Sequence, residues 1–236
     1  MNLCGFSLVC RHVLGVAKKQ APPNPLQGAM RRKNRHRAIA AIRMWLLGAI
    51  VVALGGCGIL PGNQASSTYQ LPASQLVASN ATRTDLTLRI ARPVADGRQG
   101  GTDILVSPEA FRLQRYGTGR WVAPMPVLVR DHLLEAFAND ARFARVISDR
   151  TDIPVDMELQ GHLRAYRVTL NNAAPRARVV FHAQVLDVQA HRLIQSKRFT
   201  VTEPMADAQV DTAVRALWRA TEQLARELVQ WVGAAQ

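Results

Sequence analysis

The sequence VDMELQGHLRAYRVTL, residues 155–170, decides the fold. Apolar and polar side chains alternate strictly at its start, from Val155 to Gln160. Because successive side chains of a β-strand point to opposite faces, this alternation predicts a strand that is buried on one face only. One face is expected to carry Val155, Met157, Leu159, Leu163 and Ala165, and the other Asp156, Glu158, Gln160, His162 and Arg164.

Two further segments continue this pattern. Residues 176–189 alternate in the same way, and residues 171–175 (NNAAP) before them have the composition of a turn. A second turn at residues 189–192 (QAHR) leads into another candidate strand at residues 193–201. The three segments together predict an antiparallel meander.

Shorter elements precede the meander. Strands are expected at residues 86–90, 103–106 and 111–116. The glycines of residues 117–119 (GTG) predict a turn, after which Trp121 begins a new element.

Two helices complete the expected fold. Residues 127–139 form an approximate helical stripe behind Pro126, and a short apolar cluster follows at residues 143–147. At the C-terminus, a stripe with spacings of three and four runs from residue 210 to residue 231, with Asp207 as N-cap and Gly233 as stop. Packing against the sheet is favoured for this stripe over binding to a partner. We therefore predict an α+β fold, in which two main helices pack on a mixed or antiparallel sheet that contains the meander.

The N-terminal part has the three regions of a bacterial lipoprotein signal peptide. Six Lys or Arg residues between positions 31 and 43 precede eleven uncharged, mostly apolar residues at 44–54. Gly55 and Gly56 then supply the small side chains that a peptidase needs before Cys57. We predict that the chain is cut before Cys57, that this cysteine carries the lipid, and that it anchors the protein in a membrane.

The remaining boundaries follow from this signal. Residues 30–56 form the signal peptide, and residues 1–29 do not fit it, so we predict a misplaced start codon and Met30 as the true start. Residues 57–67 read as a tether, and residues 68–236 as one periplasmic domain. An aspartate at position 58 commonly retains such proteins at the inner membrane, so Gly58 predicts the outer membrane.

The formal charge of +13 does not indicate a nucleic-acid partner. Nine of the 30 basic residues lie in residues 1–56, which contain no acidic residue. The remaining 21 basic residues and the 17 acidic residues give positions 57–236 a net charge of +4, which is ordinary for a soluble domain. No thiol chemistry is expected after processing either, because Cys57 is the only cysteine beyond position 10.

Motifs for catalysis or cofactor binding are absent from the sequence. It contains neither a G-x-S-x-G elbow nor a phosphate loop ending in G-K-[ST], and residues 117–119 lack the third glycine of a dinucleotide fingerprint. Three acids at positions 149, 152 and 156 match no calcium loop and fit a solvated loop better. No catalytic residue and no cofactor are therefore predicted.

One pair of histidines merits a metal hypothesis. If the first turn of the meander is centred on Asn172, His162 faces His182 with Cβ atoms about 5 Å apart. Two imidazoles without an evident third ligand make a weak site, so metal binding is the less favoured reading.

Several short motifs, in order behind the lipid-bearing cysteine, resemble those of the ABC-type transport auxiliary lipoproteins. Their order and their position carry the resemblance, which spans most of the processed chain. They are Thr68-Tyr69-Gln70-Leu71-Pro72, Asp103-Ile104-Leu105-Val106, Leu113-Gln114-Arg115-Tyr116, the Arg120-Trp121 pair within residues 119–126, Leu163-Arg164-Ala165-Tyr166, the strand Ala183 to Asp187, Phe199 and Trp231-Val232.

The resemblance implies a non-enzymatic component of a transport system. Such a lipoprotein would stand at the outer membrane and work with an MCE-domain protein, an ABC permease and an ATPase to move phospholipid or other hydrophobic solutes. A structural or pilotin-like lipoprotein of another envelope machine is the alternative, and an envelope hydrolase is disfavoured by the missing nucleophile motif.

Tyr116, Arg120 and Trp121 are the candidate partner interface. Aromatic residues and arginine are enriched at interface hot spots, and two prolines stiffen the segment that follows. The alternative is that Trp121 fills the core below the first helix.

Overall fold

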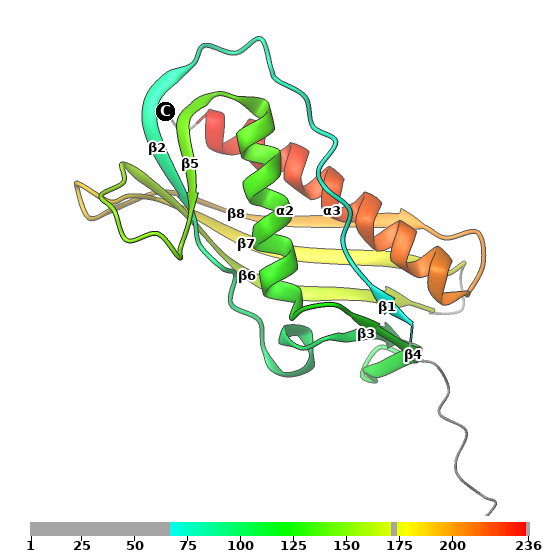
Figure 1. Cartoon of the computed structure of the whole chain (residues 1–236). Coiled ribbons are helices and arrows are strands. Elements are labelled where there is room, and N and C mark those ends of the chain that lie inside the picture. The colour runs from blue at the N-terminus through cyan, green and yellow to red at the C-terminus, as the bar shows by residue number, and fades with distance from the viewer. Residues whose placement is uncertain (1–66, 171–173, 235–236) are drawn as a thin grey trace, which may run out of the picture. The chain divides into compact units, whose positions relative to one another are not determined.

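The computed structural model describes residues 67–170 and 174–234. Within them, eight strands form one sheet and two α-helices pack on one of its faces (Figure 1). This is the predicted α+β fold. The strands are β1 (Thr68–Tyr69), β2 (Thr84–Ile90), β3 (Asp103–Ser107), β4 (Gln114–Trp121), β5 (Phe143–Ser148), β6 (Met157–Thr169), β7 (Arg176–Asp187) and β8 (Arg192–Pro204); the helices are α2 (Met125–Asp140), α3 (Val210–Gly233) and the short 3-10 helix η2 (Gly97–Gly100).

Strand β6 lies at the centre of the sheet. Along one edge it pairs antiparallel with β7, which pairs antiparallel with β8. Along its other edge, β2 pairs with its N-terminal part and β3 with its C-terminal part, both in parallel. The apolar cluster at residues 143–147 belongs to β5, which extends the sheet beyond β2, whereas β4 and then β1 extend it beyond β3.

The predicted register of the first hairpin is confirmed over its first part. His162 faces His182, and Leu163 faces Phe181. Phe181 in turn faces Phe199 of β8, so the three strands form the expected meander.

A β-bulge then moves the second part of β6 by one residue. The register shifts between Leu163 and Ala165, and Ala165 faces Val180. A one-residue shift turns every later side chain to the other face. Tyr166 and Val168 therefore join the core under the helices, and the predicted face of Ala165 is wrong.

The prediction of a strand at residues 111–116 is confirmed only for residues 114–116, and the predicted turn at residues 117–119 is wrong. Residues 117–119 do not form a turn but continue β4, and Phe111 lies before that strand with its side chain fully exposed. The glycines permit close approach instead. A Cβ on Gly119 would lie 2.7 Å from the Tyr69 ring, so only glycine lets β1 pack so near to β4.

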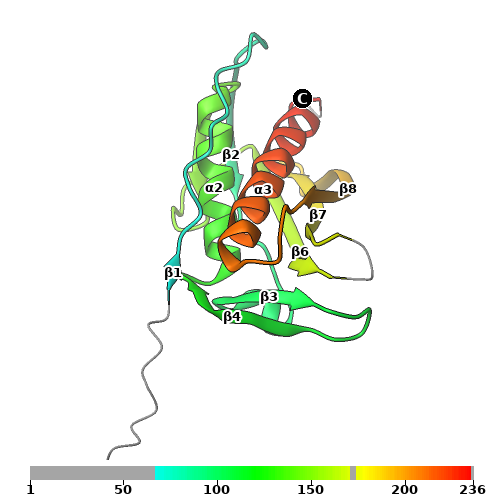
Figure 2. The same ribbon diagram turned by 90° about the vertical axis from the view of Figure 1, so that its right-hand side faces the viewer.

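Helix α3 covers the meander with the predicted apolar stripe. Leu217, Leu224 and Leu228 are fully buried in the core, and Figure 2 shows both α2 and α3 on the same side of β6, β7 and β8. The predicted N-cap is displaced by two residues. Gln209 is the N-cap, and the Asp207 carboxylate instead accepts a hydrogen bond from the Gln209 backbone N–H at 2.9 Å.

A buried polar network ties the segment after β1 to both helices. His132 of α2 lies 3.0 Å from the Glu222 carboxylate of α3 through Nε2, and 3.1 Å from the Pro72 carbonyl through Nδ1. Glu222 also accepts hydrogen bonds from the Ser74 hydroxyl and the Gln75 backbone N–H. Nε2 of His132 and Oε2 of Glu222 are both buried and make no hydrogen bond, so their 3.0 Å approach is a close polar contact inside this network.

Replacement of Glu222 should test this network. Glu222→Leu removes the acceptor of the Ser74 hydroxyl and the Gln75 N–H and the polar neighbour of the buried His132 ring, so we expect the free energy of unfolding to fall by about 1–3 kcal/mol. Glu222→Gln keeps an acceptor for Gln75 and can donate to a neutral imidazole, so the expected loss is about 1 kcal/mol. Urea unfolding of the full chain, followed by tryptophan fluorescence, measures both. No loss in Glu222→Leu would mean that the network does not stabilise the fold.

Candidate functional site

The three predicted interface residues do not share one surface. Alternation along β4 places Arg120 in solvent, but it turns Trp121 inward, where only 3% of the residue is exposed. The Trp121 ring meets Tyr166 edge-on, with the ring centroids 6.0 Å apart. An exposed Trp121 is therefore a wrong expectation, and its alternative as a core residue is confirmed.

Tyr116 is half-buried, and its hydroxyl donates a hydrogen bond to the Ala208 carbonyl ahead of α3. Only Arg120 of the three remains wholly available on the surface. Cys57 lies outside the described residues.

The structure instead assembles polar side chains on the face of the meander away from the helices. We call this the open face and call each set of side chains facing one another across β6, β7 and β8 a rung. The histidine rung is His162, His182 and Arg198; the small rung is Ala165, Val180 and Thr200; the arginine rung is Arg167, Arg178 and Thr202.

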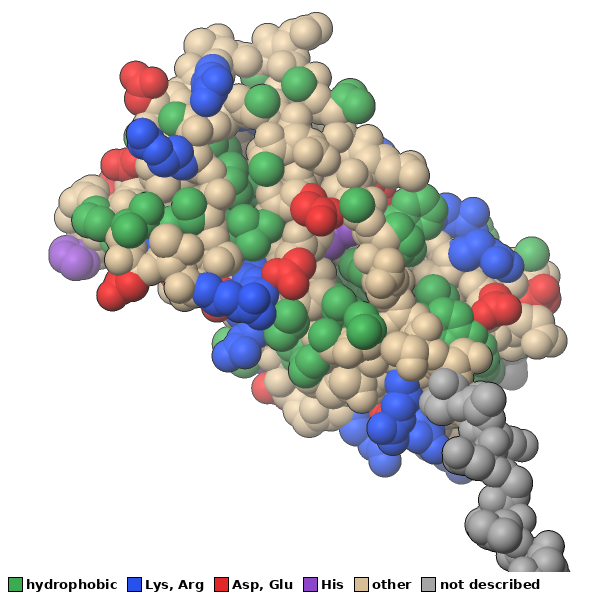
Figure 3. All heavy atoms as spheres, viewed as in Figure 1, with side chains coloured by type: hydrophobic (Ala, Val, Ile, Leu, Met, Phe, Trp, Pro, Cys, Tyr) green, Lys and Arg blue, Asp and Glu red, His purple; other side chains and the backbone are tan. Residues whose placement is uncertain are grey.

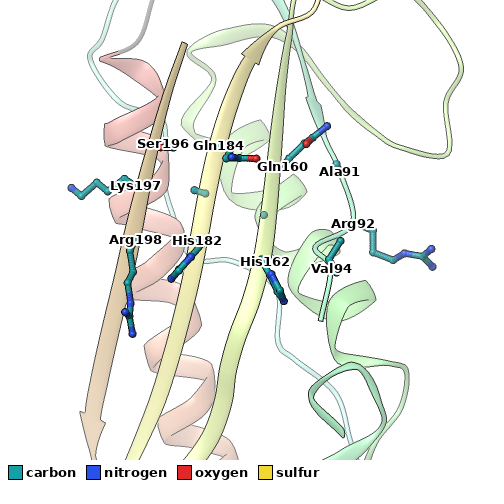
Figure 4. Close-up of a pocket in the computed structure, with 12 residues that line it drawn as sticks. Ala91, Arg92, Val94, Gln160, His162, His182, Gln184, Ser196, Lys197 and Arg198 are labelled. Carbon is teal, nitrogen blue, oxygen red and sulfur yellow. The ribbon is translucent and has the colours of Figure 1, made fainter. Parts of the chain in front are cut away.

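A groove of about 740 Å³ lies over the histidine rung. The loop residues Ala91 to Val94 and side chains such as Gln160 and Gln184 also line it. Figure 4 shows His162, His182 and Arg198 on three neighbouring strands, whereas Lys197 points the other way.

A single carboxylate is bound near the histidine rung. Asp96 lies 2.9 Å from His162 Nε2 and 2.9 Å from the Arg164 guanidinium. Burial, Arg198, Arg164 and His162 lower the pKa of His182 below the ordinary 6.5, with burial as the largest cause. The three cationic or titratable neighbours among these causes add a positive local potential to the effect of burial.

The arginine rung has no carboxylate. Among the described residues, no ion pair or hydrogen bond joins the guanidinium group of Arg167 or Arg178 to a partner, and the Nε atoms of both are buried and unsatisfied. Burial, and then the charge of Arg178, lower the pKa of Arg167. By contrast, basic and acidic side chains are interspersed on the helix side (Figure 3).

The structure adds no third metal ligand to the His162–His182 pair among the described residues. His162 and His182 do face each other, but Asp96 already engages Nε2 of His162. In the part of the chain that the structure describes, no group of three His, Cys, Asp or Glu residues could hold a metal ion. The acids at positions 149 and 156 bind the backbone N–H groups of Arg92 and Thr87.

Sequence reasoning missed the arginine rung, because its members meet only through the bulge. Without the extra residue, Arg167 would point to the helices. Alternation did place His162 and Arg164 on the polar face of the strand, so part of the open face was predicted from the sequence.

Comparison with known proteins identifies the family. Residues 69–229 match the family described as the ABC-type transport auxiliary lipoprotein component. The chain belongs to this family. As a member, it is a lipoprotein and an auxiliary component of an ABC-type transport system, which confirms the resemblance found in the sequence.

Solved structures share the fold of this auxiliary lipoprotein. The crystal structure of XCC0632 from Xanthomonas campestris has a TM-score of 0.66 at 23% identity and covers 72% of this chain and 96% of that chain. The structure of an uncharacterized protein has a TM-score of 0.57 at 11% identity and covers 71% of this chain and 98% of that chain. Among the curated proteins, none matches.

No helix within residues 67–170 and 174–234 is long and apolar enough to cross a membrane.

The potential on the open face can be tested through His182. Because the folded chain binds this proton less tightly than the unfolded chain, protonation of His182 should destabilise the fold as the pH falls through 6.5. Arg198→Gln removes one nearby cation, so we expect the His182 pKa to rise. NMR titration of the imidazole in the full chain measures it. Arg226→Gln, on the exposed side of α3, is the control; equal His182 titration in both variants would contradict the assigned cause.

Proposed function

We propose that this auxiliary lipoprotein is a non-enzymatic component of an intermembrane lipid transport system, anchored to the periplasmic face of the outer membrane through Cys57. It acts with an MCE-domain protein, an ABC permease and an ATPase in moving phospholipid. The observation that carries the proposal is the family match over residues 69–229, which spans nearly all of the described domain.

The signal sequence supports the anchoring part of the proposal. A lipid-modified Cys57 with several acyl chains gains about 0.8 kcal/mol per buried methylene, which makes attachment effectively permanent. The eleven steps of chain from Cys57 to Thr68 span at most about 40 Å when extended. The domain therefore acts close to the membrane that holds its anchor.

The polar lining of the groove argues against storage of acyl chains inside it. Its lining includes Gln160, Gln184, Ser196 and both histidines of the histidine rung. Ligand pockets for apolar molecules are lined mainly by hydrophobic and aromatic side chains. We therefore propose that the domain docks the transport machinery and meets the polar end of the lipid.

Recovery of partners from the envelope tests this function. The full chain with a C-terminal tag is crosslinked in its own bacterium, purified, and analysed by mass spectrometry. We expect an MCE-domain protein, an ABC permease and an ATPase, and we expect the tagged chain in the outer-membrane fraction of a density gradient.

Cys57→Ala is the matched control, because it leaves every described residue unchanged and removes the lipid site. It should lose the outer-membrane fractionation. Recovery of a secretin in place of the MCE-domain protein would contradict the proposal and favour the pilotin-like alternative.

A further inference from the structure

The arginine rung is an unfavourable arrangement in the isolated protein. Arg167 and Arg178 face each other directly on neighbouring strands, where two like charges destabilise a sheet. Each also keeps a buried Nε–H without an acceptor, and a buried unsatisfied donor costs about 1–3 kcal/mol. An anion placed between the two guanidinium groups would relieve the repulsion between their charges.

The neighbouring rungs extend this positive surface. Successive rungs lie about 7 Å apart, because side chains on one face of a strand repeat every two residues. The small rung therefore separates the arginine rung from the histidine rung, which carries Arg198 and has Arg164 beside it in the bulge. Thr200 and Thr202 add exposed hydroxyl donors on β8.

The donor set fits a phosphate group. Guanidinium groups bind phosphate oxygens through two parallel N–H bonds and hold their charge at any physiological pH. Arg167 and Arg178 supply two such forks, and the Thr202 hydroxyl lies on the same rung. The nearby carboxylates on this face are already engaged: Asp96 by His162 and Arg164, and Glu158 by Arg89.

The composition of the face favours a lipid headgroup over an acidic protein segment. Within the described strands β6 to β8, the open face carries no phenylalanine, tyrosine or tryptophan, although protein interfaces concentrate their binding energy in buried aromatic anchors. Ala165 and Val180 of the small rung offer only apolar surface that is already shielded, each being 3% exposed. Charge is thus the attraction that this face offers.

We infer that the open face binds the phosphate of a phospholipid headgroup, with Arg167 and Arg178 as its central contacts and Arg198 and Thr200 beside them. The choice of a lipid as the source of that phosphate rests on the proposed function. The lipid would be engaged by its headgroup while its acyl chains remain outside the domain.

A soluble short-chain lipid tests the site in the full chain. The lipidated protein is purified in dodecyl maltoside, which carries neither charge nor phosphate, and dihexanoylphosphatidylglycerol is titrated by calorimetry. We expect saturable binding that Arg167→Gln/Arg178→Gln weakens about tenfold or more, since a hydrogen bond to a charged group contributes about 1.5–3 kcal/mol. Arg226→Gln, the matched control on α3, should change affinity less than twofold.

Competitors separate the possible sources of the anion. At equal ionic strength, hexaglutamate should displace the lipid poorly, and inorganic phosphate should compete through its charge but bind more weakly than the lipid, because it lacks the headgroup hydroxyls that Thr200 and Thr202 can bond. Phosphate binding as tight as that of the lipid would overturn the headgroup assignment in favour of a free anion. Tighter binding of hexaglutamate than of the lipid would overturn the assignment in favour of an acidic protein partner. The site itself would be overturned if the wild type did not bind the lipid, or if the double variant bound it as tightly as the wild type.

Two controls keep the result interpretable. Near-ultraviolet circular dichroism checks the fold of each variant, and Arg167→Lys/Arg178→Lys, which retains charge but not the planar fork, should show intermediate affinity even if the glutamine variant does not fold. The partner recovery described above does not depend on this binding. An MCE-domain protein recovered without lipid binding would reject only the present inference, and lipid binding without that partner would reject only the proposed function.

Discussion

The β6–β7–β8 meander has one apolar face that must be covered, and the rest of the molecule follows from that constraint. Helix α3 covers the face with a stripe whose leucines at positions 217, 224 and 228 are fully buried. Each buried leucine contributes about 1.5–3 kcal/mol. Helix α2 packs beside it, and the His132–Glu222 pair fixes the segment after β1 to both helices. Because both helices lie on one side, the other face of the meander is left without a covering helix (Figure 2).

A single extra residue in β6 decides what that solvent face carries. The bulge at Leu163–Ala165 turns Tyr166 and Val168 into the core and brings Arg167 opposite Arg178. The same local feature therefore completes the packing on one side and creates a pair of unpartnered cations on the other. Each buried unsatisfied group in a folded protein needs an explanation, and binding of an anion is the one that we infer for this pair.

Much of this fold was predictable from the spacing of apolar residues along the sequence and from the residues typical of turns. Alternation located the meander, the NNAAP turn set the register of His162 against His182, and helical spacing located α3. The bulge was missed, although the sequence carries a sign of it: the apolar residues move from odd positions up to Leu163 to even positions at Tyr166 and Val168. The course of β4 was missed because its glycines usually signal a turn, yet here they allow β1 to approach. Whether Trp121 is exposed depends on which face of β4 its side chain occupies, and the Arg120-Trp121 motif alone does not reveal that face.

The central claim is that the two faces of the meander have separate roles, the closed face in stability and the open face in binding. Urea unfolding of Arg167→Gln/Arg178→Gln beside Leu217→Ala in the full chain tests it most directly. Leu217→Ala should lower the free energy of unfolding by about 2–5 kcal/mol. The double glutamine variant should be as stable as the wild type or more stable, because it removes the repulsion between facing charges. A loss of more than about 1 kcal/mol in that variant would contradict the account, since the two arginines would then belong to the scaffold.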